Sequence, residues 1–261
     1  NLARTTSVRP LVAALEARVA DLEADIPALT DEQIIARFMA LTAMVGDGHT
    51  TLGLNALYQP PFNYHTLPLG IQWYPSGWYV IGGLPDYRPY IGTRVTALNG
   101  TPITEVVEAV QSLISHDNEM QLRSNTGMYL TTPEVLLGLG FVTDVERVEL
   151  TLAPQDGDEV TISGASVDRA SLADAVTAAD FFDEVPLARQ NAEDWYWYTY
   201  LADEKKIYFQ YDVCRNMDDL SFSDFNDEMF AFIDDHDIEA IVVDLRFNGG
   251  GNSMVLNPFL K

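Results

Sequence analysis

The sequence is poor in several residue types, and each shortage argues against a class of protein. It has one cysteine, Cys214, so no internal disulfide can form and no zinc-ligand spacing is present. Lys and Arg number 15 against 39 Asp and Glu, and the net charge of -24 disfavours nucleic acid and anionic lipid surfaces as partners. No apolar run reaches the roughly 18 residues of a membrane-spanning helix, so we expect no membrane insertion.

The first residues, Asn1 to Arg4, lack the apolar core of a signal peptide, so we expect any leader to have been removed from this chain. Apolar residues make up 47% of the sequence and are spread along it, which is typical of a folded protein. These features leave the compartment open between the cytoplasm and the bacterial cell exterior.

Two helices are predicted at the N-terminus. Apolar residues recur at helical spacing from Leu11 to Ile26, and Thr30 with Gln33 has the capping-box pattern that starts a second helix, which ends at Gly46. This second helix leads into Asp47-Gly48-His49-Thr50, after which we expect a strand over residues 51–54.

The middle of the chain reads as a β-rich module with packed helices. Strands are predicted over 70–74, 78–81, 93–98, 148–152 and 160–162, and helices over 104–114 and from Pro133 onward. Beyond it come a linker with a short helix over 171–179, a strand over 206–211, a helix over 221–236 and an apolar strand over 240–245. The last strand–helix–strand order predicts a parallel sheet covered by helices.

The first motif that could carry chemistry is a glycine loop. The strand ending at Leu245 is followed by Arg246-Phe247-Asn248 and then by Gly249, Gly250 and Gly251. Such a loop can bring backbone N–H groups close to a negative charge, so it suits an oxyanion hole or a phosphate site. Neither the P-loop nor the dinucleotide motif is present, and a glycine turn without a ligand is the alternative.

The second motif is the histidine at position 49. A loop imidazole with an ordinary pKa near 6.5 suits a general base at neutral pH. His65, His116 and His236 are interpreted as structural, and Cys214 as buried filler rather than a nucleophile.

Taken together, these segments resemble the S41 serine peptidases, the family of the carboxy-terminal processing (tail-specific) proteases, the tricorn core protease and chlamydial protease-like activity factor. DGHTTL at Asp47 to Leu52 is similar to the DGHT signature of the histidine-using branch, and VVDLRFNGGGN at Val242 to Asn252 is similar to its D-L-R-x-N-G-G-G segment. Four further stretches resemble the family in the same order: 92–107 (its PDZ-like region), 115–123, 132–140 and 207–216.

The resemblance implies roles for particular residues. His49 would be the general base, and Gly249 and Gly250 would supply oxyanion N–H groups, with Gly250 slightly preferred. Asp47, Asp244, Arg246 and Asn248 would be supporting residues. No metal or cofactor is implied, and the partner would be a peptide or protein substrate, with a bacterial extracytoplasmic location slightly favoured.

The implied fold class is α+β. Residues 1–55 would be the N-terminal helical segment ending in the DGHT loop, 56–164 a β-rich PDZ-like module, 165–194 a linker and 195–261 the start of a crotonase-like α/β catalytic domain.

The chain departs from the family because the nucleophilic serine and the acid that orients the histidine would lie beyond Lys261. Ser253 is too close to the glycine loop to be that serine, so we expect this chain alone to be inactive. Two alternatives stay open: a non-catalytic peptide-binding module or pseudo-peptidase, and a phosphate or nucleotide binder for which Arg246 is the only nearby cation.

Overall fold

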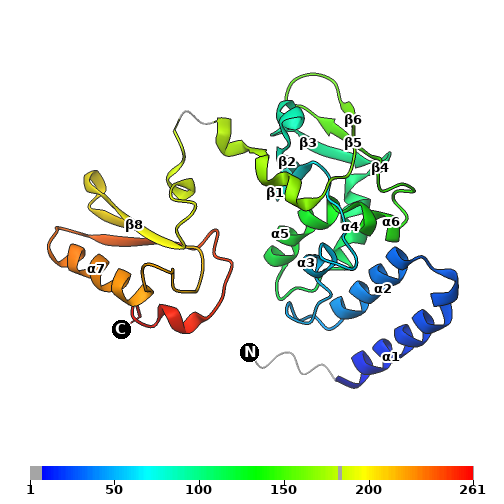
Figure 1. Ribbon diagram of the computed structural model, residues 1–261, viewed down its shortest axis with the longest axis horizontal. Coiled ribbons are helices and arrows are strands. Elements are labelled where there is room, and N and C mark those ends of the chain that lie inside the picture. Colours follow the sequence, from blue (N-terminus) through cyan, green and yellow to red (C-terminus); the bar gives the residue numbers. More distant parts are fainter. Residues whose placement is uncertain (1–7, 182–183, 261) are drawn as a thin grey trace. The chain divides into compact units, whose positions relative to one another are not determined.

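A computed structural model describes residues 8–181 and 184–260 (Figure 1). The expectation about the first four residues falls outside these ranges. The chain divides into two compact units, residues 1–181 and 182–261, which are described separately below. Both contain helices and strands, which confirms the α+β fold class. Among the described residues, no helix is long and apolar enough to span a membrane.

The first unit begins with the two predicted helices. They are α1 (Val8–Asp25) and α2 (Asp31–Ala43), joined by a 3-10 turn, η1 (Ile26–Ala28). The capping box is confirmed: the Thr30 N–H donates to the Gln33 side chain at 3.1 Å, and the Gln33 N–H donates to the Thr30 hydroxyl at 3.4 Å.

The strand expected over 51–54 is wrong. A short helix, α3 (Leu54–Leu57), begins at the last of these residues instead. Leu54 and Leu57 are three positions apart, and both side chains are buried, at 1% and 0% exposure. A helical turn places them on one face, where they pack into the core, so tertiary packing overrides the local β pattern.

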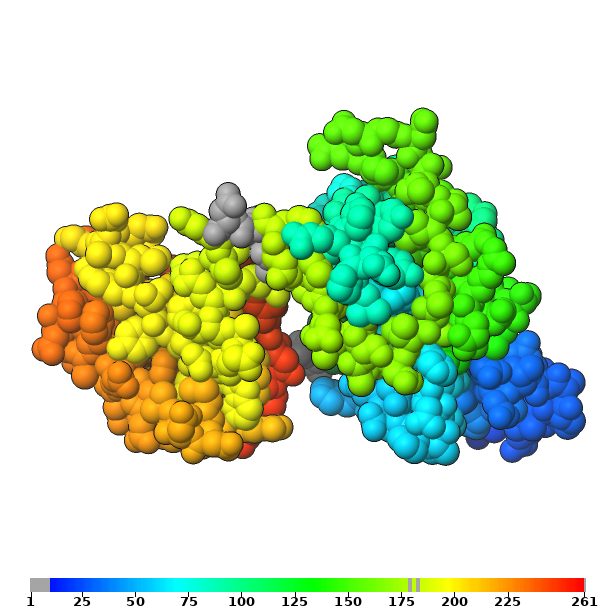
Figure 2. Space-filling view, turned by 45° about the horizontal axis from the view of Figure 1, so that its top comes forward, coloured from blue at the N-terminus to red at the C-terminus, as the bar shows by residue number. Residues whose placement is uncertain are grey.

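An antiparallel sheet forms the centre of the first unit, and the predicted strands are confirmed with small shifts in their ends. Its strands are β1 (Leu69–Tyr74), β2 (Gly77–Gly83), β3 (Arg94–Leu98), β4 (Thr101–Pro102), β5 (Val148–Ala153), β6 (Val160–Gly164) and β7 (Val176–Thr177). The main order is β1-β2-β3-β5-β6, with β4 on β3 and β7 on β2. The turn between β5 and β6 projects from the rest of the unit (Figure 2).

Helices α4 (Ile103–Gln111) and α5 (Glu119–Leu130) pack against this sheet, and α6 (Pro133–Gly138) packs against α2 and α5. The approach of α5 to β1 is so close that a Cβ on Gly127 would lie 1.9 Å from the Ile71 carbonyl oxygen, so only glycine fits there. The short helix expected over 171–179 is wrong. Two 3-10 turns, η3 (Arg169–Asp174) and η4 (Ala178–Phe181), flank β7 instead, and another, η2 (Pro85–Tyr90), follows β2.

The second unit holds a three-stranded sheet of order β10-β9-β8, made of β8 (Tyr196–Leu201), β9 (Lys206–Tyr211) and β10 (Ala240–Asp244). The pair β9–β10 is parallel, as predicted, whereas β8 is antiparallel to β9. Within the described residues, β10 is an edge strand, and its Val242 and Val243 side chains are 42% and 41% exposed.

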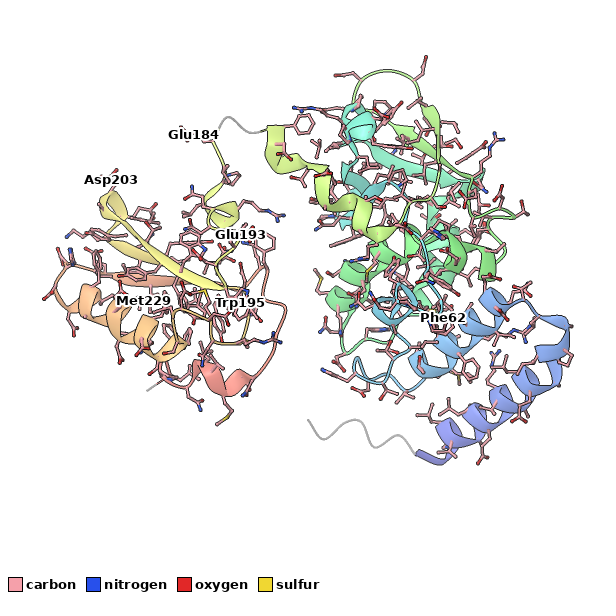
Figure 3. All side chains as sticks on the ribbon, in the orientation of Figure 1. Phe62, Glu184, Glu193, Trp195, Asp203 and Met229 are labelled. Carbon is pink, nitrogen blue, oxygen red and sulfur yellow. The ribbon has the colours of Figure 1, made fainter. Side chains whose placement is uncertain are left out.

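One helix, α7 (Phe222–Asp234), covers the three-stranded sheet, and Met229 lies fully buried between them (Figure 3). Aromatic rings fill the same core: the Phe225 ring centroid lies 4.9 Å from that of Tyr196 and 5.5 Å from that of Phe209. The remaining elements are 3-10 turns: η5 (Leu187–Arg189), η6 (Ala202–Glu204) and η7 (Ser253–Leu256).

Candidate active site

The loop that carries His49 folds around the carboxylate of Asp47. One oxygen of Asp47 accepts the Thr50 hydroxyl at 2.6 Å, and the other accepts the His49 N–H at 3.4 Å. These bonds, with the Thr50 hydroxyl contributing most, hold the pKa of Asp47 below its ordinary value. The His49 side chain itself is 93% exposed, with Nδ1 3.9 Å from the Asp47 carboxylate. The backbone is therefore fixed while the imidazole faces solvent.

The same loop is tied to the segment between α4 and α5. The Gly48 N–H donates to the Asp117 carboxylate at 3.0 Å, and the buried Ser115 hydroxyl donates to the Thr50 carbonyl oxygen at 2.8 Å. A Cβ on Gly48 would lie 2.8 Å from both the Asp117 carboxylate and the Gln121 amide nitrogen. Residues nearly seventy positions away thus set the position of the loop.

Asp47, His49 and Asp117 also form the one group of three among the described residues whose ligand atoms could hold a metal ion, all lying within 4.8 Å of one another. Both carboxylates already accept hydrogen bonds from the loop backbone. These hydrogen bonds to the loop backbone are sufficient to explain why the two carboxylates lie close to His49.

Two of the other three histidines, His116 and His236, make local contacts. The Nδ1 atoms of His116 and His236 lie 2.8 Å and 2.7 Å from the carbonyl oxygens of Ile114 and Phe232. His65 has a stronger partner, because its Nδ1 lies 2.6 Å from Oε1 of Glu134, a residue that is 7% exposed. This hydrogen bond is the main cause that raises the pKa of His65. Sequence reasoning missed the pair, because its members are 69 positions apart.

The glycine loop lies in the second unit, directly after β10 and beside the end of β9. Two of its backbone N–H groups already have partners: the Gly249 N–H donates to the Asp212 carbonyl oxygen at 2.8 Å, and the Gly250 N–H donates to the Asn248 side chain at 2.9 Å. Gly250 has a φ of +86°, which favours glycine.

Asn248 fixes this loop to the end of β9. Its amide nitrogen donates to the Tyr211 carbonyl oxygen at 2.7 Å, while its amide oxygen accepts the Gly250 N–H. Cys214 lies against the loop as well, since its N–H donates to the Gly250 carbonyl oxygen at 2.8 Å. Its side chain is half-buried and packs with the aromatic core, in agreement with its interpretation as filler.

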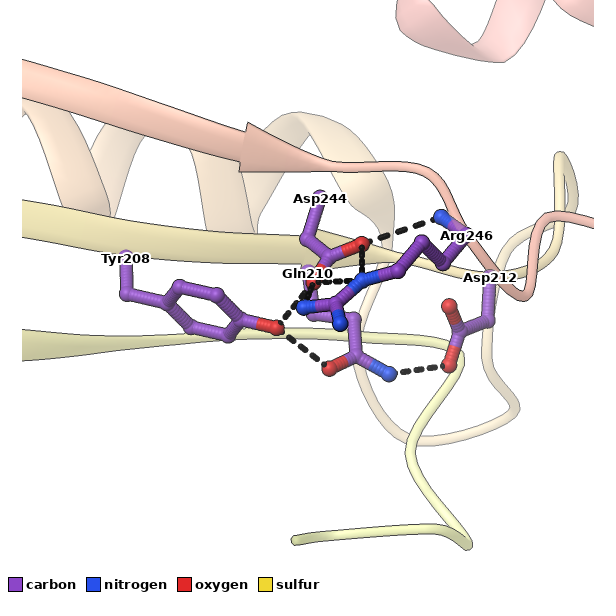
Figure 4. Close-up of polar contacts among 5 residues, drawn as sticks. All are labelled: Tyr208, Gln210, Asp212, Asp244 and Arg246. Carbon is purple, nitrogen blue, oxygen red and sulfur yellow. Dashed lines mark hydrogen bonds and ion pairs between the residues drawn. The ribbon is translucent and has the colours of Figure 1, made fainter. Parts of the chain in front are cut away.

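A chain of polar side chains runs along the sheet beside the loop (Figure 4). The Arg246 guanidinium chelates the buried Asp244 carboxylate and, as the largest cause, lowers the pKa of Asp244. The Tyr208 hydroxyl donates to Asp244 at 2.6 Å, and burial, followed by this contact, raises the pKa of Tyr208 to about 12. The Gln210 amide then donates to Asp212 at 2.7 Å. The predicted supporting residues Asp244 and Arg246 therefore form an ion pair next to the loop.

The predicted site residues fall into two groups. Asp47 and His49 lie together in the first unit, and Asp244, Arg246, Asn248, Gly249 and Gly250 lie together in the second. Ser253 is exposed and begins η7 immediately after the loop. Sequence reasoning missed Ser115 and Asp117 as anchors of the His49 loop, although both lie in the stretch 115–123 that resembles the S41 family.

No protein-family model matches the chain, and no curated protein sequence matches it. Solved structures do. A structure of mature CPAF complexed with lactacystin matches with a TM-score of 0.55 at 14% identity, over 88% of this chain and 48% of that one. A CPAF point mutant matches with a TM-score of 0.60 at 12% identity, over 94% and 52%. Mature CPAF matches with a TM-score of 0.50 at 13% identity, over 85% and 46%.

These matches show a fold like that of CPAF, the chlamydial protease-like activity factor. The chain spans about half the length of the structures it matches. At 12–14% sequence identity, the similarity to CPAF concerns the fold alone.

Proposed function

We propose that this chain carries the general base and the oxyanion loop of an S41-type serine peptidase whose nucleophilic serine lies outside residues 1–261. The observation that carries the proposal is the DGHT loop: its backbone is fixed by Asp47 and Asp117 while the His49 imidazole stays 93% exposed. An anchored loop with a free imidazole is what a general base requires. The CPAF-like fold supports the same class of protein.

In the proposed reaction, His49 takes the proton of the serine hydroxyl as the serine attacks the peptide carbonyl, and later returns it to the leaving amine. The negative oxygen of the tetrahedral intermediate would be stabilised by N–H groups of the glycine loop. Gly250 suits this role better than Gly249. Its N–H is bonded to a side-chain oxygen, Asn248 Oδ1, which an oxyanion could replace while the Asn248 amide nitrogen keeps its bond to Tyr211, whereas the Gly249 N–H is bonded to the backbone carbonyl of Asp212.

The supporting residues would keep that loop in place. The ion pair joins the exposed Arg246 side chain to the buried Asp244 carboxylate at the end of β10. The two hydrogen bonds of the Asn248 side chain join the glycine loop to the end of β9. The Arg246 guanidinium is paired with the Asp244 carboxylate. A phosphate site at the glycine loop would need a cation available to the phosphate, so this ion pair disfavours the phosphate-binding alternative.

A non-catalytic peptide-binding module is the second candidate function. A cavity of about 800 Å³ in the first unit favours it, since its lining combines apolar side chains such as Leu69 and Ile71 with the polar Thr66 and Thr131. This candidate predicts peptide affinity that survives His49→Ala.

The two candidates separate in one experiment on the full-length protein that contains residues 1–261. Hydrolysis of a casein or peptide-library substrate should fall by several orders of magnitude in His49→Ala and stay unchanged in His236→Ala, a histidine held at a helix end. A serine-reactive fluorophosphonate should label a serine outside residues 1–261. Hydrolysis that is undiminished in His49→Ala would reject the proposed role of His49, and peptide binding without hydrolysis would favour the binding module.

A further inference from the structure

Ser115 and Asp117 lie in the turn that leads into α5. Ser115 is 4% exposed, whereas the Asp117 carboxylate is at the surface. Both side chains nevertheless reach the same short stretch of chain, residues 48–50. Their contacts are made to backbone groups of that stretch, so they act on its position and not on its side-chain chemistry.

The two contacts lie on either side of His49. The Asp117 carboxylate accepts the N–H of Gly48, one residue before the histidine, at 3.0 Å. The Ser115 hydroxyl donates to the carbonyl oxygen of Thr50, one residue after it, at 2.8 Å. A residue whose neighbours are fixed on both sides has little freedom left in its own backbone, so its Cα–Cβ direction is set.

The acceptor is itself held in place. The Asp117 N–H donates to the Gln121 side chain at 2.7 Å, and the Gln121 N–H donates to Asn118 at 2.9 Å, which caps α5. The position of the Gly48 partner is therefore built into the start of a helix. Gly48 has no Cβ, and one added there would lie 2.8 Å from the Asp117 carboxylate, so a side chain at this position would push the acceptor away.

From these contacts we infer that Asp117, together with Ser115, is the positioning residue of the His49 loop. The inference rests on the proposed function, in which His49 is the general base. Asp117 touches no reacting atom in this role. It acts through the Gly48 N–H, and the requirement is for a hydrogen-bond acceptor at this point.

That requirement distinguishes two substitutions. Asp117→Asn keeps an oxygen acceptor of the same shape, whereas Asp117→Ala removes the acceptor. The first test measures amide hydrogen exchange of Gly48 by NMR in the chain of residues 1–261. Exchange of this amide should become about tenfold faster in Asp117→Ala and stay near the wild-type rate in Asp117→Asn. The control is Asp144→Ala, which removes a comparable carboxylate that accepts the Glu146 N–H at 2.9 Å in a different turn.

The second test uses peptide hydrolysis by the full-length protein. We expect kcat to fall about a hundredfold in Asp117→Ala with little change in KM, because a misplaced base affects the transition state more than substrate binding. Asp117→Asn should restore most of the rate, and Asp144→Ala should leave it unchanged. Thermal melting of each variant shows whether the first unit stays folded, and Ser115→Ala gives a second, independent way of releasing the loop.

The outcomes separate the inference from the function on which it rests. Unchanged Gly48 exchange in Asp117→Ala would overturn the inference, as would equal losses in Asp117→Asn and Asp117→Ala. If the wild-type full-length protein hydrolyses no peptide, the proposed function fails, whereas the Gly48 exchange rates still decide whether Asp117 holds the loop.

Discussion

The pair of His65 and Glu134 should make the stability of the first unit depend on pH. The imidazole Nδ1 of His65 lies 2.6 Å from Oε1 of Glu134, and the same carboxylate oxygen accepts the backbone N–H of His65 at 3.0 Å. Asp168, 4.0 Å from Nε2, adds to the negative charge around the ring, as does Glu146. These carboxylates, chiefly Glu134 through its hydrogen bond, raise the pKa of His65 in the folded state.

A raised folded-state pKa means that the protonated ring binds its partners better in the folded than in the unfolded chain. The resulting stabilisation is fully present below the unfolded pKa of about 6.5 and is lost as the pH rises through the higher folded pKa. A hydrogen bond to a charged group contributes about 1.5–3 kcal/mol, and the His65 side chain is 36% exposed, so solvent screening reduces the pH-dependent part to about 1 kcal/mol.

The perturbation is Glu134→Gln, which keeps the shape of the side chain and removes its charge. We expect the variant to be less stable than the wild type, and the difference should shrink by about 1 kcal/mol between pH 5.5 and 8.5, or about 0.5 M in the urea midpoint. Unfolding is followed through exchange of the β1 to β6 amides, so that only the first unit is reported. His116→Gln serves as the control, because its ring contacts a carbonyl oxygen. A difference between wild type and Glu134→Gln that is constant with pH would refute the reasoning.

Four further substitutions test the packing and the glycine loop. Gly127→Ala should destabilise the first unit by about 3 kcal/mol in urea unfolding, since the new Cβ meets a backbone oxygen, and a variant as stable as wild type would contradict the close approach of α5. Met229→Ala should cost about 2–5 kcal/mol and Met254→Ala less than about 0.5 kcal/mol, because the first side chain is fully buried and the second is 65% exposed. Asn248→Ala should cost about 1–3 kcal/mol and speed exchange of the Gly250 amide, and unchanged exchange would show that Asn248 does not hold the loop.

Local patterns were sufficient to predict much of the fold. The capping box at Thr30, the alternation of Val148, Leu150 and Leu152, and the apolar run that became β10 each depend on residues close in sequence. Such patterns predict whether a segment is a helix or a strand, because the spacing of the apolar residues determines whether they share one face of the element.

Of the α-helices and strands that the sequence did not predict, α5 and β8 are the longest, and each was missed for a physical reason. Helix α5 lacks a clear apolar stripe, since it contains Ser124, Asn125 and Gly127 and meets β1 through its backbone. Strand β8 (Tyr196–Leu201) has aromatic residues at four of its six positions, on both faces, so no alternation marks it.

The candidate site was predictable only in its separate motifs. DGHT and the glycine loop are visible in the sequence, but the anchors of the first, Ser115 and Asp117, are 65 and 69 positions away from their partners. The pairing of His65 with Glu134 spans 69 positions as well. Contacts of this kind depend on how the sheet and helices pack, which no local pattern reports.

The exposed edge of β10 has a practical consequence for handling the second unit by itself. The residues Val242 and Val243 of this strand, and Leu245 just after it, are 41–55% exposed. An unpaired strand edge with exposed apolar residues can pair with the same edge of another molecule. A preparation of residues 184–260 would therefore tend to aggregate through β10. A lysine introduced at Val243 would place a charge on that edge and keep the fragment in solution.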